Sequence, residues 1–205
     1  MSAIELRGVE KSYGSLHVLR GARAAFEEGR VHVVMGPSGA GKTTLLRLVA
    51  GLEAPDAGEV AVPEGARLGM VFQEDRLLDN LTATANIRLP HGRLRGDELE
   101  AFLATERKAL ASVGLPVDSR PVGELSGGQR RRVAILRCVL SEASVLLFDE
   151  PLKGMDVATV ARVMDYLMPL LAERTVLWVT HDPQEKELLP SPVLWDVRDG
   201  AVSRL

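Results

Sequence analysis

The chain has little that suits an oxidising compartment or a membrane interior. Its 205 residues include a single cysteine, Cys138, which excludes an intrachain disulfide framework and a cluster of cysteines around a metal. Its longest apolar runs, such as residues 145–148, fall far short of the ~20 residues that cross a bilayer. Glu5 lies where a secretory signal would need an apolar stretch. We therefore expect a soluble, cytoplasmic chain that is still able to dock onto a membrane protein.

The chain also lacks an excess of positive charge. Its 25 Lys and Arg residues against 28 Asp and Glu residues give a formal net charge of −3. Such a balance lacks the electrostatic signature of a dedicated nucleic-acid binder, so we expect no nucleic-acid partner. Hydrophobic residues make up 46% of the chain and charged residues 26%, values typical of a folded globular protein. The length suits one compact domain, or a core domain with a smaller lobe.

Strand-like and helical patterns alternate along most of the chain. The sequence predicts strands over residues 4–9, 18–19, 22–26, 30–35, 58–62, 68–72, 145–148 and 175–179, and a hairpin over 193–202. We expect the first of these to be an edge strand. Helices are predicted over residues 43–50, 97–113, 127–140 and 157–171. Asp97 is the expected N-cap of the second helix, and Gly114 with Pro116 should end it. Because residues from about 77 to 140 are helical in character, the pattern indicates an α/β fold with a helical lobe.

A glycine-rich motif follows the strand predicted over residues 30–35. It comprises Gly36, Pro37, Ser38, Gly39, Ala40, Gly41, Lys42 and Thr43, which fit the phosphate-binding pattern G-x-x-x-x-G-K-[ST] in full. Its glycines allow N–H groups to turn inward around phosphate oxygens, and the following helix adds its free N-terminal N–H groups. Lys42 supplies a cation for the β- and γ-phosphates, the Thr43 hydroxyl is placed to hold Mg²⁺, and Thr44 is a further nucleotide-binding candidate. The alternative, a glycine-rich turn without chemistry, does not explain why strand, spacing and helix agree.

Two carboxylates end the hydrophobic strand predicted over residues 145–148. A core strand can deliver such groups to the edge of the sheet beside the phosphate loop. Asp149 would then bind Mg²⁺, directly or through water, and Glu150 would orient and deprotonate an attacking water. A strand that simply ends in polar residues is the alternative, which the complete phosphate loop disfavours.

The segment Leu125–Gln129, with the sequence Leu-Ser-Gly-Gly-Gln, opens the helix predicted over residues 127–140. Its polar and glycine positions form a second helix N-terminus able to bind phosphate: Ser126, Gly127, Gly128 and Gln129. With the phosphate loop upstream and the acidic strand end downstream, the chain resembles the ATP-binding subunit of ABC transporters over nearly its whole length. In that family two copies pair head to tail and sandwich two ATP molecules between them.

The resemblance implies a particular kind of α/β fold. It is a P-loop NTPase (RecA-like) core with an N-terminal antiparallel β subdomain and an inserted helical subdomain. Residues 1–74 and 143–205 would form the β subdomain and the core, and residues from about 75 to 142 the helical signature subdomain, within a single ABC ATPase domain. ATP and Mg²⁺ are the cofactors that the resemblance implies.

Further positions match the family one by one. Tyr13 matches the aromatic residue that stacks on adenine, and His181 looks like the switch histidine that contacts the γ-phosphate. Gln73 looks like the glutamine that meets the metal and the attacking water and relays to the membrane partner. Asp156 matches the aspartate of the family's D-loop, whereas Lys153 puts a bulky cation where a small hydroxyl residue is usual.

The resemblance also implies a transport partner. Residues 71–87 are similar to importer ATPases of the nitrate, sulfonate and taurine group, although those usually have Pro-Trp where this chain has Asp79-Asn80. The implied protein is an ATPase subunit on the inner face of the cell membrane. It would work with an integral membrane permease, a second ATPase subunit and an extracytoplasmic solute-binding protein.

Other functions stay open at this level. A P-loop kinase or GTPase shares the phosphate loop but does not account for Leu125–Gln129 or His181. A soluble ABC-type ATPase acting on DNA or ribosomes is the stronger rival, and an exporter is a rival to the importer. A non-enzymatic module is disfavoured because the candidate catalytic residues are all present. The run of arginines at 130–132 is interpreted as a solvated helix face or an intersubunit contact rather than a nucleic-acid patch.

Overall fold

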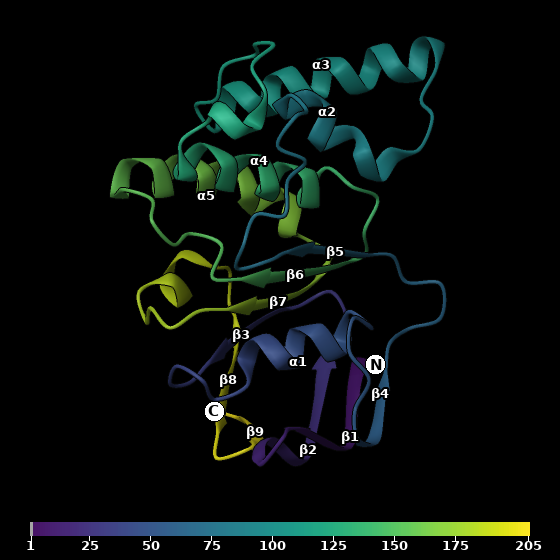
Figure 1. The fold of residues 1–205 in the computed structure, drawn as a ribbon, viewed down its shortest axis with the longest axis vertical. Helices are drawn as coiled ribbons and strands as arrows, with labels where there is room; N and C mark the ends of the chain where they lie inside the picture. The colour runs from purple at the N-terminus through teal and green to yellow at the C-terminus, as the bar shows by residue number, and fades with distance from the viewer. Residues whose placement is uncertain (1) are drawn as a thin grey trace. The chain divides into compact units, whose positions relative to one another are not determined.

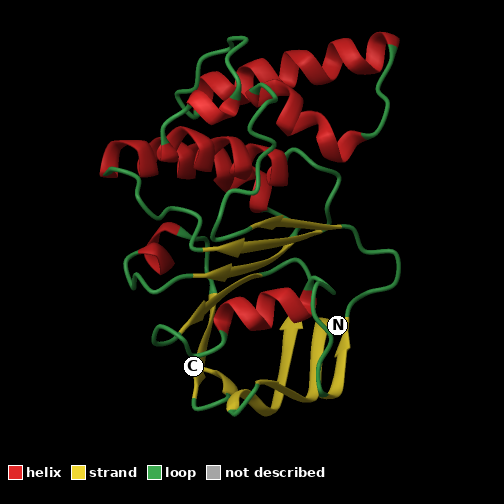
Figure 2. Ribbon diagram, viewed as in Figure 1, coloured by secondary structure: helices red, strands yellow, loops and turns green. Residues whose placement is uncertain are grey.

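The computed structural model describes residues 2–205, which divide into two compact units (Figure 1). The first unit comprises the described residues up to Met70, Ser144–Glu150 and Leu171–Leu205. The second comprises Val71–Ala143 and Pro151–Leu170. Strands dominate the first unit and helices the second, as Figure 2 shows. None of the helices within residues 2–205 is long and apolar enough to cross a membrane.

A three-stranded antiparallel sheet begins the first unit, in the order β2 (Leu16–Glu27), β1 (Ser2–Tyr13) and β4 (Ala57–Ala61). The prediction of an edge strand at the start of the chain is therefore wrong, because β1 lies between two partners. Alternating apolar residues indicate that one face of a strand is buried, and Ile4 is indeed buried. They do not show how many neighbouring strands it pairs with. The two runs predicted over residues 18–19 and 22–26 are parts of the single strand β2.

A six-stranded sheet forms the rest of the strand structure. Its order is β5 (Leu68–Val71), β6 (Val145–Asp149), β7 (Thr175–Val179), β3 (Val31–Met35), β8 (Val193–Arg198) and β9 (Ala201–Arg204). The strands β6, β7, β3 and β8 run parallel, and β9 pairs antiparallel with β8 as the predicted hairpin. Every residue of β6 and β7 is buried, which explains their continuous apolar sequences. The parallel strands bring their carboxyl ends to one edge of the sheet.

The helix α1 (Lys42–Val49) follows β3 and carries the core of the first unit. Its buried leucines share one apolar cluster with residues of both sheets, including Ile4 of β1, Val34 of β3 and Trp195 of β8. Figure 1 shows α1 lying across the three-stranded sheet. This packing fixes the position of the helix N-terminus, where the phosphate motif ends.

The second unit contains four α-helices: α2 (Ala83–Arg88), α3 (Gly96–Ser112), α4 (Gly127–Val139) and α5 (Val157–Leu171, whose last residue belongs to the first unit). Short 3₁₀ turns cover Leu89–His91 and Val122–Glu124 here, and Glu185–Leu188 in the first unit. The helices predicted over residues 127–140 and 157–171 are confirmed.

The ends of α3 show where local signals succeed and fail. Asp97 is not its N-cap, because Arg95 holds that position and Asp97 lies in the first turn, where a carboxylate interacts favourably with the helix dipole. Gly114 does end the helix: it has φ +68°, and the N–H of the next residue, Leu115, bonds to Leu110 O at 2.8 Å. Glycine reaches this left-handed conformation without the cost that a side chain would add.

Candidate nucleotide-binding site

The glycines of the phosphate loop are required by close packing. Gly36 has φ +141°, and a Cβ built there would lie 2.2 Å from the carbonyl oxygen of Val197. Gly41 has φ +104°, and a Cβ there would lie 2.6 Å from Val18 Cγ1. The loop is therefore a backbone cradle that a larger residue at either position would distort.

Lys42 folds back over this loop. Its Nζ donates hydrogen bonds to Gly36 O and Pro37 O, each at 2.8 Å, and the residue is 7% exposed. Burial lowers the pKa of Lys42, while the charges of Glu150, Asp149 and Asp196 raise it. A cation is thus held against loop carbonyls, in the place where a phosphate group would offer it a stronger partner.

The first turn of α1 completes the cradle. Gly41 occupies the N-cap position in the left-handed conformation and has no side chain with which to bond the first N–H groups of the helix. These N–H groups and the helix dipole favour an anion at this end. Thr43 lies in this turn beside Lys42, and the neighbouring Thr44 is buried.

Tyr13, at the end of β1, is exposed over 45% of its surface and is anchored at its hydroxyl end. The hydroxyl donates a hydrogen bond to the carboxylate of Glu53, which also pairs with Arg47 of α1 at 3.2 Å. Burial of the hydroxyl end and then the bond to Glu53 raise the pKa of Tyr13. The ammonium of Lys11 lies 5.6 Å from the ring centroid. The ring is therefore held in one orientation with part of its surface open to a ligand.

Asp149 and Glu150 lie at the carboxyl end of β6. Asp149 is 2% exposed and pairs in register with Val179 of β7. Glu150 has φ +48°, an uncommon value for a residue with a side chain, and its N–H donates to Val179 O at 2.9 Å. Such a conformation costs on the order of 1–3 kcal/mol and is concentrated at functional sites. Here it turns the Glu150 side chain toward the end of the neighbouring strand.

His181 lies just after that neighbouring strand, β7. The residue before it, Thr180, is buried, donates its N–H to Val34 O at 3.2 Å, and accepts the Asp182 N–H at its hydroxyl at 3.0 Å. This turn places His181 Nδ1 2.7 Å from Glu150 Oε1. The structure thus brings together two residues that the sequence separates by 31 positions.

Ser126 caps the signature helix α4. Its hydroxyl accepts the Gln129 N–H at 3.3 Å, and the Gln129 side chain accepts the Ser126 N–H at 2.9 Å, which is a complete capping box. Ser126 and Gly127 are exposed, so the turn presents its polar surface outward. The predicted start of this helix is confirmed, and its cap is a feature that the sequence analysis did not identify.

Asp156, the residue expected to match the D-loop aspartate, has a local structural role. Its carboxylate accepts the N–H of Thr159 at 2.9 Å and the Thr159 hydroxyl at 2.8 Å, at the start of α5. The hydrogen bonds from Thr159 lower the pKa of Asp156. Lys153, the departure from the family pattern, is exposed.

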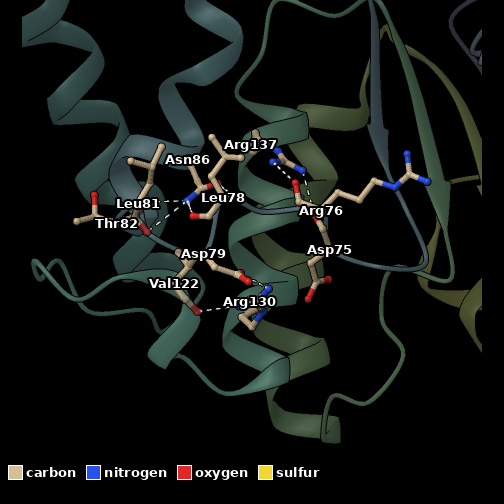
Figure 3. Close-up of polar contacts among 10 residues, drawn as sticks. All are labelled: Asp75, Arg76, Leu78, Asp79, Leu81, Thr82, Asn86, Val122, Arg130 and Arg137. Atoms are coloured by element: carbon tan, nitrogen blue, oxygen red, sulfur yellow. Dashed lines mark hydrogen bonds and ion pairs between the residues drawn. The ribbon is translucent and has the colours of Figure 1, made fainter.

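The arginines at 130–132 were interpreted from the sequence as a solvated helix face or an intersubunit contact. For Arg131 the solvated face is wrong, since this residue is 5% exposed. Arg130, the neighbour of Arg131 in this run, binds within the second unit (Figure 3). Arg130 pairs with Asp79 at 2.7 Å and donates to Val122 O at 3.1 Å. The burial of Arg131 was not predicted, because a run of like charges on a helix gives no sign of the carbonyl groups that face it.

The candidate residues therefore fall into two sets. The first unit holds the phosphate loop at residues 36–44 with Tyr13, Asp149, Glu150 and His181. The second unit holds Gln73, whose side chain is exposed, together with Ser126–Gln129 and Asp156.

The donors at this site suit a magnesium nucleotide. The loop is a cradle that Cβ atoms would fill, and Lys42 and the α1 N-terminus offer positive charge to phosphate. Thr43 and Asp149 offer hydroxyl and carboxylate oxygens, the ligand type that Mg²⁺ prefers. Among residues 2–205, no group of three or more His, Cys, Asp or Glu side chains is placed to hold a metal ion.

Known proteins are similar to this chain in sequence and in fold. Residues 19–153 match the ABC transporter family. The aliphatic sulfonates import ATP-binding protein SsuB 1 of Nocardia farcinica is 40% identical over 196 residues, which cover 94% of this chain and 77% of that protein. The sn-glycerol-3-phosphate import ATP-binding protein UgpC of Burkholderia cenocepacia is 38% identical over 210 residues, covering 95% of this chain and 57% of that protein.

A solved structure agrees over nearly the whole chain. The dimeric ATP-binding cassette MJ0796, in a post-hydrolysis state bound to ADP and Pi, superposes with a TM-score of 0.85 at 29% identity, covering 98% of this chain and 97% of that one. The phosphate loop between β3 and α1, with an acidic end on a parallel strand, defines a P-loop nucleotide-binding fold. The chain belongs to the ABC transporter family and is an ATP-binding, ATP-hydrolysing subunit of that family. The predicted fold class and family are confirmed.

Proposed function

We propose that this chain is the ATPase subunit of an ABC importer that works with a separate membrane permease. Its relatives named above are import ATP-binding proteins, at 40% and 38% identity over more than nine-tenths of this chain. The geometry that carries the hydrolytic part of the proposal is the pair Glu150–His181, with 2.7 Å between Glu150 Oε1 and His181 Nδ1. The proposal of import, as opposed to export, rests on the names of these relatives.

Nucleotide binding is assigned to the phosphate loop and Tyr13. The loop N–H groups, the α1 N-terminus and Lys42 would bind the phosphates, with Thr44 in the same turn. The ring of Tyr13 would stack on adenine. Glu53 and Lys11 support this role because they hold the ring while nearly half of the residue's surface remains exposed.

Magnesium is assigned to Thr43, Asp149 and Gln73. When bound, Mg²⁺ offsets the charge that develops on the phosphate oxygens during phosphoryl transfer. The Thr43 hydroxyl follows the phosphate loop directly, and the buried Asp149 carboxylate lies at the end of a core strand. Gln73 would add an amide oxygen, as the resemblance to the family implies.

Hydrolysis is assigned to Glu150 acting as general base on water. Its carboxylate would take the proton of the attacking water, and Lys42 would stabilise charge on the γ-phosphoryl group. His181 holds one carboxylate oxygen at 2.7 Å and would contact the γ-phosphate when nucleotide binds. The hydrogen bond from His181 would orient the base.

Two copies are proposed to complete each site. The turn of Ser126–Gln129, in which Ser126 and Gly127 are exposed, would bind the nucleotide held by the facing copy. Asp156 would lie at the same interface. Residues from about 75 to 142 would form the helical signature subdomain that relays hydrolysis from Gln73 to the permease. The complex would lie on the inner face of the cell membrane and receive solute from an extracytoplasmic binding protein.

Purification from the native membrane tests this proposal. The chain would be isolated in mild detergent and the stoichiometric partners identified by mass spectrometry. We expect a multi-span permease whose presence stimulates ATP hydrolysis by the chain. Recovery with ribosomes or DNA instead would contradict the proposal in favour of a soluble ABC-type ATPase. Substrate efflux by the reconstituted complex would contradict the direction of transport.

A further inference from the structure

The guanidinium of Arg131 is buried within the second unit, where it contacts residues 72–75 and Pro151. From α4, Nη1 donates to Phe72 O, to Gln73 O at 3.4 Å and to the Asp75 carboxylate at 3.1 Å. Nε donates to Pro151 O at 3.1 Å. One side chain therefore joins the segment that contains Gln73 to the segment that directly follows Glu150 in the chain.

Residues 72–76, which we call the glutamine loop, are held by a second arginine of the same helix. Arg137 donates to Arg76 O at 2.8 Å and to Asp75 O at 3.0 Å (Figure 3). Arg76 has φ +46°, and its guanidinium carbon lies 4.1 Å from the ring centroid of Phe72. The loop is thus a tight turn whose carbonyl groups point at α4, and α4 supplies the donors.

Because Arg131 is buried, its contacts strongly stabilise the conformation of the glutamine loop. Its side chain is 6% exposed and that of Asp75 is 17% exposed, so the ion pair is largely withdrawn from water. Removing one partner of such a pair leaves a buried charge uncompensated, which is strongly destabilising. The planar guanidinium also donates in several directions at once, which the single ammonium of a lysine does not reproduce.

We propose that Arg131 is a positioning residue for catalysis. It fixes the backbone conformation at Gln73 and bonds that backbone to α4, the helix that Ser126 caps. The glutamine loop and the signature turn then move as one, and the Pro151 segment moves with them. The inference rests on the proposed role of Gln73 as a metal ligand, because Arg131 acts through that residue.

The predicted effect is specific for the metal-dependent step. With Arg131→Gln the loop loses its buried charge partner and Gln73 is no longer held in place. Misplacement of a catalytic group by about 1 Å can cost on the order of 10²-fold in rate, so we expect kcat to fall about 10–100-fold. The Mg²⁺ concentration for half-maximal activity should rise. ATP affinity in the presence of EDTA should stay unchanged, because the phosphate loop and Tyr13 belong to the first unit.

The test uses the full chain and three variants, with phosphate release measured during a Mg²⁺ titration and ATP binding measured by calorimetry in EDTA. Arg131→Gln removes the charge, and Asp75→Asn removes its partner at a less buried position that keeps the test valid if Arg131→Gln does not fold. Arg130→Gln is the matched control, since Arg130 is the adjacent arginine on α4 and pairs with Asp79. We expect the first two variants to need more Mg²⁺ and the control to match the wild type.

Three results would overturn the inference. They are wild-type kinetics in a folded Arg131→Gln or Asp75→Asn chain, a loss of ATP affinity in EDTA without a change in Mg²⁺ dependence, and an equal effect of Arg130→Gln. A wild-type chain that releases no phosphate in any condition would count against the proposed function instead. The failure of the inference and the failure of the function are therefore distinguishable.

Discussion

The carboxylate of Glu150 and the imidazole of His181 are hydrogen-bonded across the ends of two neighbouring parallel strands, with 2.7 Å between Oε1 and Nδ1. The backbone reinforces this contact, because Glu150 has φ +48° and donates its N–H to Val179 O. The backbone of Glu150 is therefore bonded to β7, and its side chain to the residue that lies just after β7. A general base held in this way needs little reorganisation before it acts.

Glu150→Gln keeps the size of the side chain but removes the base. We expect turnover to fall about 10²–10⁴-fold while ATP still binds, because the phosphate loop is intact. Phosphate release and calorimetry measure the two effects. Glu28→Gln, an exposed carboxylate of the same unit, is the control and should match the wild type. Hydrolysis at the wild-type rate in Glu150→Gln would remove this residue from the mechanism.

His181→Ala should also lower kcat, because the Glu150 carboxylate loses the partner that orients it. Residues that act as a unit give strongly non-additive losses, so adding Glu150→Gln to His181→Ala should lower the rate little further. His17→Ala, an exposed histidine of β2, is the matched control. Multiplicative losses in the double variant would show that the two residues act independently.

Lys42→Ala should weaken nucleotide binding itself. A hydrogen bond to a charged group contributes about 1.5–3 kcal/mol, which corresponds to a loss of affinity of about 10–100-fold. Calorimetry with ATP measures this directly, and Lys108→Ala on the exposed face of α3 is the control. If the affinity of Lys42→Ala equals that of the wild type, Lys42 does not bind the phosphates.

Glu106 should make the stability of the chain depend on pH. It is fully buried on α3, and within the described part of the chain neither of its oxygens has a hydrogen-bond partner. Burial raises its pKa to about 7, while Arg88 and Arg107 lower it. The folded pKa lies above the unfolded value, so the contribution is fully present below about pH 4.5 and is lost as pH rises through 7.

Glu106→Gln removes that dependence, because an amide does not ionise. We expect the variant to raise the free energy of unfolding by about 1–3 kcal/mol at pH 8 and to change it much less at pH 5. Denaturant unfolding at the two pH values measures the difference, with the exposed Glu98→Gln on the same helix as control. An equal effect of Glu106→Gln at both pH values would contradict the assignment of the titration to this carboxyl group.

Features governed by local sequence were predictable. The phosphate loop, its strand and its helix are contiguous, so the positions of Gly36 and Gly41 follow from the pattern and the structure supplies the close contacts that demand glycine. The long helices at 127–140 and 157–171 were likewise predictable, because their apolar periodicity extends over several turns.

Features governed by distant contacts were not predictable. The central place of β1 in its sheet depends on its pairing with β4, which is about 50 positions away in the sequence. The burial of Arg131 depends on carbonyl groups about 60 positions away, at Phe72 and Gln73. Charged residues on a helix are solvated unless another segment of the chain packs against them, and the sequence does not show which segment does so.

The central claim is that ATP closes two copies of this chain around a shared site. Its most direct test is the molar mass of the Glu150→Gln chain, measured by light scattering with and without saturating Mg-ATP. We predict a monomer without nucleotide and a dimer with it. A chain that stays monomeric at high protein concentration with saturating Mg-ATP, alone and within its membrane complex, would contradict the account.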